Sequence, residues 1–204
     1  MDIIDKNIER LTTYKKYLNT IQALIDKYFE EQKDYIFCKK GCPHCCEKGC
    51  YPYSEIEFLY LYLGFLSLST TEKIEISKRV EKLKTECEES QLPHDEFMYR
   101  CPFLRDTGEC SVYDYRGLIC RNFGIMHINL KNQITMPFCE DLGLNYSNVY
   151  NDETKKFDYE KVKEYGYKYI PKPYPITRAS LMDKDLFEGE PLDFGETKTL
   201  LDWL

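Results

Sequence analysis

The sequence predicts a mainly α-helical protein with two loop-rich cysteine blocks and an extended C-terminal arm. Three observations lead to this prediction. Apolar residues recur at helical spacing in three stretches of the first 90 residues. Nine of the ten cysteines fall into two blocks that are punctuated by glycine and proline. The cysteines stop before Tyr146, and the chain beyond carries a proline-rich stretch.

The first predicted helix covers residues 4–29. Its apolar residues recur at steps of three and four and therefore share one face, while lysines and acids fill the other. They are Ile4, Ile8, Leu11, Tyr14, Leu18, Ile21, Ile25 and Tyr28. A coiled-coil seam between two chains is the alternative, but the repeat covers fewer than four clean heptads. We therefore interpret this face as one that packs on the core.

Two capping-box pairs predict where the next helices begin. In each pair, Ser54 with Glu57 and Ser69 with Glu72, the serine oxygen and the carboxylate can satisfy free amides at a helix start. The helix after Ser54 is apolar almost all round, so we expect it at the centre of the core. The helix after Ser69 has a narrower apolar stripe that includes Cys87, which we interpret as a small core residue.

Patterns are weaker in the second half of the chain. They predict a short hairpin at 125–134 with its turn at Lys131-Asn132, a helix at 158–165, an extended stretch at 169–175 and a closing helix at 197–204. We expect a helical domain over residues 1–145 and an arm over residues 146–204 that packs on the same core.

Composition and charge exclude several classes of partner. The net charge is -7 and the pI is about 5.2, whereas phosphate binding needs a basic surface, so nucleic acid is not expected as a partner. The most apolar run, Ile56–Leu68, is too short to span a bilayer, and we expect no membrane partner. The first residues lack the apolar stretch of a signal peptide, which predicts a cytoplasmic protein.

Ten cysteines in a cytoplasmic chain indicate metal binding rather than disulfides. Closely spaced thiolates on a turn-rich loop can reach a common metal ion. The first block offers few sulfurs that converge easily, so we expect the second block to complete the site and the two blocks to converge on one metal centre. The candidate ligands are Cys38, Cys42, Cys45, Cys46, Cys101, Cys110, Cys120 and Cys139. The sequence does not decide whether Cys50 is an additional ligand or takes no part in the site.

The adjacent pair Cys45 and Cys46 leaves two alternatives open. Neighbouring side chains rarely point the same way, so either one ligates while the other packs, or the two serve neighbouring metals. Arg116 and Arg121 flank Cys120 and are candidate cofactor-binding residues, because a guanidinium can offset the charge of clustered thiolates. The alternative for both arginines is a surface salt bridge.

The histidines are weaker candidates. His44 lies inside the first block, and we expect it beside the ligands or in solvent rather than on the metal. His94 and His127 are isolated in the sequence and receive no predicted role.

The cysteine motif resembles the YkgJ-like cysteine-cluster family, a zinc- or iron-chelating CxxCxxCC domain. The resemblance covers roughly residues 38–139 and lies in Cys38-Lys-Lys-Gly-Cys42-Pro-His-Cys45-Cys46, Cys101-Pro-Phe-Leu, Gly108-Glu-Cys110-Ser-Val-Tyr113, Arg116 and Cys120-Arg121-Asn-Phe123. Pro43 and Gly117 depart from the family pattern, and both are turn residues that affect local geometry more than ligation. The resemblance implies a metal. Some family members resemble flagellin lysine-N-methylases, which implies a protein or peptide substrate.

Two functions follow as hypotheses. The first is a metal-binding protein with a redox or protein-modifying role, holding an iron–sulfur cluster, with [4Fe–4S] favoured, or zinc. The alternative is a scaffold module with structural zinc and no catalysis. The Cys-x3-Cys-x2-Cys spacing also occurs in radical S-adenosylmethionine enzymes, but the chain lacks the strand–helix alternation of their barrel. Methyl transfer rests on the resemblance alone, and no catalytic residue can be named.

Overall fold

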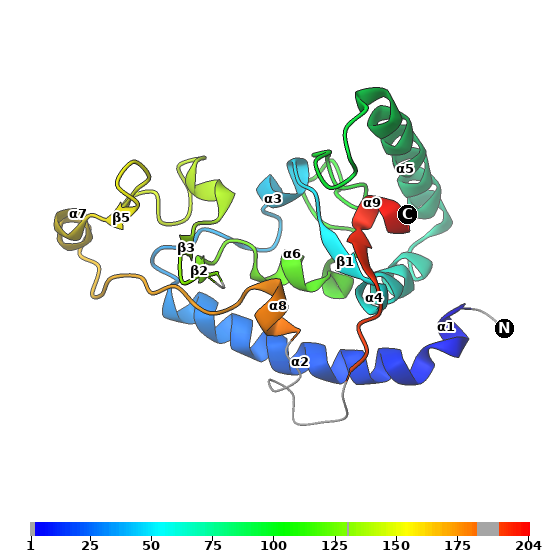
Figure 1. Cartoon of the computed structure of the whole chain (residues 1–204), viewed down its shortest axis with the longest axis horizontal. Coiled ribbons are helices and arrows are strands. Elements are labelled where there is room, and N and C mark those ends of the chain that lie inside the picture. Colours follow the sequence, from blue (N-terminus) through cyan, green and yellow to red (C-terminus); the bar gives the residue numbers. More distant parts are fainter. Residues whose placement is uncertain (1–2, 130, 183–191) are drawn as a thin grey trace.

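The computed structural model describes residues 3–129, 131–182 and 192–204. Helices dominate this part of the chain, and each of its sheets has two strands. A long helix runs along one side of the molecule, and the shorter helices and cysteine loops lie above it (Figure 1). The protein is therefore mainly α-helical, as the sequence predicts.

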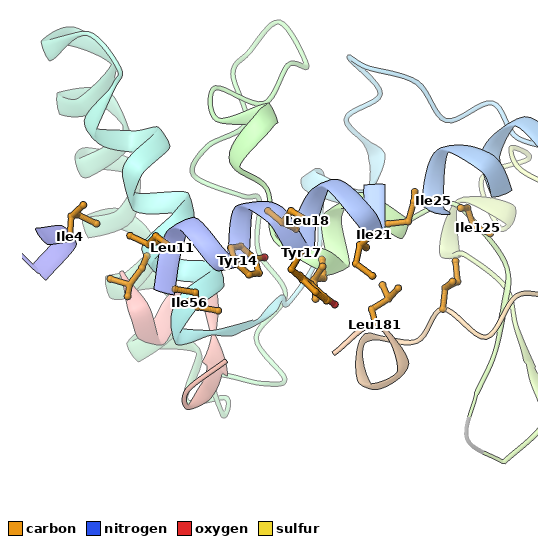
Figure 2. Close-up of a cluster of buried hydrophobic side chains, with 13 residues drawn as sticks. Ile4, Leu11, Tyr14, Tyr17, Leu18, Ile21, Ile25, Ile56, Ile125 and Leu181 are labelled. Carbon is orange, nitrogen blue, oxygen red and sulfur yellow. The ribbon is translucent and has the colours of Figure 1, made fainter. Parts of the chain in front are cut away.

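The first predicted helix is present but is divided at Asn7. Helix α1 covers Ile3–Lys6 and helix α2 covers Ile8–Glu31. The Asn7 side chain donates a hydrogen bond to the carbonyl of Ile3 at 2.9 Å, and such side-chain bonds compete with the helical pattern. Most of the predicted apolar face of α2 is buried, namely Leu11, Tyr14, Leu18, Ile21 and Ile25, whereas Ile8 is exposed. Figure 2 shows Ile21 directed toward Leu181.

Both capping boxes form, and the helices begin where the sequence predicts. Helix α4 covers Glu55–Leu66 after Ser54, and helix α5 covers Thr70–Ser90 after Ser69. Helix α4 contributes to two core clusters, Ile56 to the cluster of α2 and Leu61 to the cluster of α5. Cys87 of α5 is buried in the second cluster, as expected for a small core residue.

The predicted closing helix at 197–204 is wrong in its first part. Strand β6, Thr197–Thr199, pairs antiparallel with strand β1, Pro52–Ser54, and helix α9 covers only Leu200–Trp203 (Figure 1). β-branched threonines fit a strand, and the β1 backbone offers a partner that no local pattern reveals. The pairing holds the C-terminal residues against the second core cluster.

The remaining elements are short. They are α3 (His44–Glu47), the 3-10 turns η1 (Tyr113–Tyr115) and η2 (Phe138–Glu140), α6 (Leu118–Asn122), β2 (His127–Ile128), β3 (Ile134–Thr135), β4 (Tyr150–Asn151), β5 (Lys156–Phe157), α7 (Tyr159–Glu164) and α8 (Arg178–Leu181). The β2–β3 pair confirms the predicted hairpin, and α7 confirms the predicted short helix. Across the described ranges, no helix is both long and apolar enough to cross a membrane.

Residues beyond 146 pack on more than one part of the core. Ile176 and Leu181 join the cluster of α2, whereas Val149 and Val162 form a third cluster with Tyr35. The predicted division into a domain over 1–145 and an arm over 146–204 stays a prediction.

A buried carboxylate joins three helices. Glu57, at the third position of α4, accepts hydrogen bonds from the amide and hydroxyl of Ser54 at 2.9 and 2.7 Å. Its other oxygen accepts from the amide of Leu118, at the start of α6, at 2.8 Å. Arg178 of α8 forms an ion pair at 2.7 Å with the oxygen that Ser54 also contacts. A buried charge is tolerated only with such partners, so these contacts tie α6 and α8 to α4.

We predict that Glu57→Ala lowers the free energy of unfolding by about 3 kcal/mol or more, because it leaves Arg178 and two amides without their acceptor. Glu72→Ala is the matched control, since Glu72 is the equivalent capping-box residue of α5 and also pairs with an arginine, Arg105, but its side chain is 32% exposed. Urea unfolding of both variants measures the difference. Equal losses of stability would contradict a special role for the buried carboxylate.

Candidate metal centre

Backbone hydrogen bonds join the first cysteine block to the second. The amide of Cys101 donates to the carbonyl of Cys46 at 2.8 Å. Next to this bond, Gly49 and Tyr99 exchange two hydrogen bonds as an isolated antiparallel bridge. The segment that leaves α3 is therefore paired with the segment that enters the second block.

Tyr53 of β1 positions the part of the second block that carries Cys120. Its hydroxyl accepts a hydrogen bond from the amide of Gly117 at 3.1 Å and lies 3.4 Å from the Cys120 sulfur. The Glu57 carboxylate holds the next amide of the same turn. Cys110 lies on a separate small hairpin, bridged to Leu104.

Cys38 is positioned by a buried asparagine. The Asn145 side chain accepts from the amide of Phe37 at 2.8 Å and donates to the carbonyl of Gly124 at 2.7 Å. It thereby holds the chain before Cys38 against the end of α6, and the Cys38 sulfur lies 3.7 Å from the carbonyl of Phe123. Cys139 is buried in η2, which packs against α3.

Seven of the eight predicted ligands line two adjoining cavities. An open cavity of about 270 Å³ is lined by Cys38, Cys42, Cys45, Cys46, Cys110 and Cys120. A smaller cavity of about 20 Å³ adjoins it and is lined by Cys45, Cys46, Cys101, Cys110 and Cys120. Cysteines from both blocks thus meet in one region of the molecule.

Burial and mutual repulsion disfavour ionisation of the grouped thiols. Burial raises the pKa of five cysteine thiols. The pKa rises to about 12 for Cys38 and Cys120 and to about 11 for Cys139, and it also rises for Cys101 and Cys110. Neighbouring cysteines raise each of these pKa values further. Only a cation placed among the sulfurs would offset both costs, which fits a metal.

The adjacent thiols of Cys45 and Cys46 influence each other's ionisation in opposite directions. The sulfurs of Cys45 and Cys46 lie 3.8 Å apart. A hydrogen bond from Cys45 lowers the pKa of Cys46, and the guanidinium of Arg116 lowers it further. The same hydrogen bond is the largest cause that raises the pKa of Cys45. Cys46 is therefore the thiol of this pair that ionises first.

The two arginines differ in what they contact. Arg116 lines both cavities and stacks on Tyr113, with its guanidinium 3.5 Å from the ring centre. Arg121 lines only the open cavity. Its three nitrogens donate to the carbonyls of Arg116 and Asp114 and to the side-chain oxygen of Gln22. Neither arginine forms an ion pair within the described residues, so this structure does not contain the surface salt bridge that was the alternative.

The other cysteines and the histidines do not face the two cavities. The Cys50 sulfur donates to the carbonyl of His94 at 3.4 Å, and Cys87 lies in the core. The His94 ring pairs with Asp202 at 2.5 Å. His44 is exposed at the start of α3, and His127 belongs to β2. None of these residues lines either cavity.

Sequence reasoning did not assign Tyr53, Glu57 or Asn145 to this region. Glu57 had a detectable local signal, the capping box, but that pattern does not disclose its bonds to α6 and α8. Tyr53 and Asn145 act through partners far away in the sequence, so no spacing rule could have found them.

The donor set fits a metal in its chemistry, because soft thiolates are the ligands that zinc and iron–sulfur clusters prefer. As the side chains stand, no three His, Cys, Asp or Glu within residues 3–129, 131–182 and 192–204 form a group that could hold a metal ion. A cysteine sulfur moves between staggered positions about a single torsion, so ligation would need the cysteine side chains to rotate.

Searches of protein-family models, of curated proteins and of solved structures find no match to the chain. The resemblance to the cysteine-cluster family therefore rests on the motif residues alone, and it stays a prediction.

We predict that Gly124→Ala disturbs the Cys38 segment. Gly124 has a φ of +98°, and an added Cβ would lie 2.9 Å from the Cys38 sulfur and 3.0 Å from the Asn145 amide nitrogen. Gly143→Ala is the matched control, because its φ of +73° carries similar backbone strain but no atom lies within 4 Å of its Cβ. The control should cost about 1 kcal/mol, and Gly124→Ala clearly more. Equal unfolding free energies in urea would count against a close-packed Cys38 segment.

Proposed function

We propose that the protein binds a thiolate-coordinated metal centre, an iron–sulfur cluster or zinc, with ligands from both cysteine blocks. The observation that carries this proposal is the gathering of seven half-buried cysteines from the two blocks around adjoining cavities. Neutral thiols that merely pack as small apolar groups would not need glycine-rich loops to bring them together. The candidate ligands are Cys38, Cys42, Cys45, Cys46, Cys101, Cys110, Cys120 and Cys139.

The charge of the surroundings supports the proposal. Clustered thiolates keep net negative charge even with a metal bound, and a guanidinium stabilises them. Arg116 lines both cavities and lowers the pKa of Cys46, Cys110 and Cys120. Arg121 helps to position Arg116, since its side chain donates a hydrogen bond to the carbonyl of Arg116. We assign Arg116 to charge compensation and Arg121 to positioning the loop that carries it.

A redox or protein-modifying role is the favoured use of the centre. The cavity of about 270 Å³ opens beside the thiols and would give a reactant access to them. A protein or peptide is the substrate class that the family resemblance implies. No catalytic residue is assigned.

Structural zinc in a scaffold is the second candidate, favoured by the irregular chain around the site. The segments that carry the cysteines have only single helical turns and isolated bridges. Loops of this kind need a constraint to offset their conformational entropy, and structural zinc supplies about 10 kcal/mol of folding free energy.

Purification without oxygen, followed by metal analysis and a visible spectrum, separates these possibilities. A broad absorption band near about 400 nm with iron and sulfide indicates a cluster, and zinc without colour indicates the scaffold. Protein that is folded, fully reduced and free of both metals, even after anaerobic incubation with zinc or with iron and sulfide, would contradict the proposal.

We predict that Cys120→Ser lowers metal content and stability together, because ligation contributes to folding. Cys87→Ala is the control. Cys87 is buried but lines neither cavity, so this variant should keep its metal and lose only a packing contribution of about 1 kcal/mol. Metal analysis and thermal unfolding test both variants. Loss of metal from Cys87→Ala with retention in Cys120→Ser would show that the ligands are misassigned.

A further inference from the structure

We propose that Tyr53 donates a hydrogen bond to the metal-bound sulfur of Cys120 and thereby lowers the electron density on that ligand. This inference rests on the proposed function and adds a positioning residue to the site. Hydrogen bonds to the sulfurs are among the factors that set the reduction potential of iron–sulfur centres, and partners of this kind also support the affinity of a site for its metal.

The Tyr53 hydroxyl has a single hydrogen, and its surroundings direct that hydrogen to the sulfur. The hydroxyl oxygen accepts the amide hydrogen of Gly117 at 3.1 Å and lies 3.4 Å from the Cys120 sulfur. A cysteine that binds a metal has lost its proton, so a ligating Cys120 can only accept and the tyrosine must be the donor. Tyr53 is 2% exposed, which shields this contact from water.

The hydroxyl and the sulfur are held by the same turn of the chain. Gly117 donates its amide hydrogen to the hydroxyl, and its carbonyl accepts from the amide of Cys120 at 3.1 Å. A Cβ at position 117 would lie 2.7 Å from the Tyr53 ring, so the glycine gives the ring room to approach. Cys120 lines both cavities in this arrangement. The residue that contacts the hydroxyl is therefore also one that borders the candidate site.

The C-terminal residues hold the backbone of the tyrosine. Strand β1 pairs with β6, and the indole nitrogen of Trp203 donates to the carbonyl of Tyr53 at 3.0 Å. Leu200, between β6 and Trp203 in the sequence, lines the smaller cavity together with Tyr53. The donor is thus fixed by contacts that do not depend on a metal, as expected of a residue that orients a ligand in advance.

Tyr51 provides a matched comparison two residues earlier. It lines the same smaller cavity, but its hydroxyl donates to the backbone carbonyl of Cys45 rather than to a sulfur. Among the hydrogen bonds of the described residues, Tyr53 supplies the one hydroxyl that contacts the sulfur of a candidate ligand. The two tyrosines therefore separate an effect on the sulfur from an effect on the backbone.

Co²⁺ binding tests this inference, because the energy of the thiolate-to-cobalt charge-transfer band reports the electron density on the sulfurs. The full chain, reduced and freed of metal, is titrated anaerobically with Co²⁺ in competition with a chelator. Without the hydrogen bond the sulfur electrons lie higher in energy, so we expect Tyr53→Phe to move the band to longer wavelength and to weaken Co²⁺ binding about tenfold. Tyr51→Phe should keep the band at the wild-type wavelength, whatever its effect on stability.

An unshifted band in Tyr53→Phe, or equal shifts in the two variants, would overturn the inference while leaving the proposed function in place. A wild type that binds no Co²⁺ would overturn both. Should Tyr53→Phe not fold, a crystal structure of the Co²⁺-loaded wild type decides. A Tyr53 hydroxyl in hydrogen-bond contact with a metal-bound Cys120 sulfur supports the inference, and a Cys120 sulfur that is unligated or turned away from the hydroxyl overturns it.

Discussion

The structure depends on a carboxylate that has been taken out of water. Within the described residues, Glu57 is the one acidic side chain that is fully buried, and each of its oxygens has a partner. Since removing a partner from a buried ion costs several kcal/mol, α4, α6 and α8 are held in one arrangement. The beginning of α6 is fixed by this carboxylate and by Tyr53, and Cys120 is the third residue of this helix. The hydrophobic core thus reaches the cysteine region through a short chain of polar contacts.

The cysteine region has the opposite character. Three of its cysteines, Cys101, Cys110 and Cys120, pack against the second core cluster. The region has little regular structure and joins its segments through a few backbone bonds and the Asn145 side chain. Burial raises the pKa of most of its thiols, so the region would gain stability from a cation that stabilises their thiolate forms. Metal sites typically have surrounding residues that hold the ligands in position before the metal binds, and Tyr53, Glu57 and Asn145 are placed to do so here.

Local signals in the sequence predicted the helices well, and long-range pairing limited the rest. The capping boxes at Ser54 and Ser69 marked two helix starts correctly, because all their partners lie within three residues. The strand at Thr197–Thr199 was predicted as helix, since its partner β1 lies far away in the chain. Asn7 interrupts the first helix through its own side chain, which an apolar periodicity does not register.

The residues of the candidate site could be predicted from the sequence, but their individual roles could not. Cysteine spacing identified the residues that gather, including the contribution of the second block, because clustered thiols have few other uses in a reduced chain. Spacing could not assign Cys50, whose sulfur lies at the carbonyl of His94, nor separate the roles of Arg116 and Arg121. The positions of the two arginines depend on the turn at Gly117 and Leu118, which Tyr53 and Glu57 hold from outside the second block.

The most direct test of the account is a crystal structure of anaerobically purified protein, with anomalous data collected at the absorption edge of the metal found by elemental analysis. The account predicts anomalous density among the cysteines, with sulfurs from both blocks bound to the same centre at metal–sulfur distances of about 2.3 Å. Density held by the first block alone, or cysteines from the two blocks that surround no metal, would contradict it.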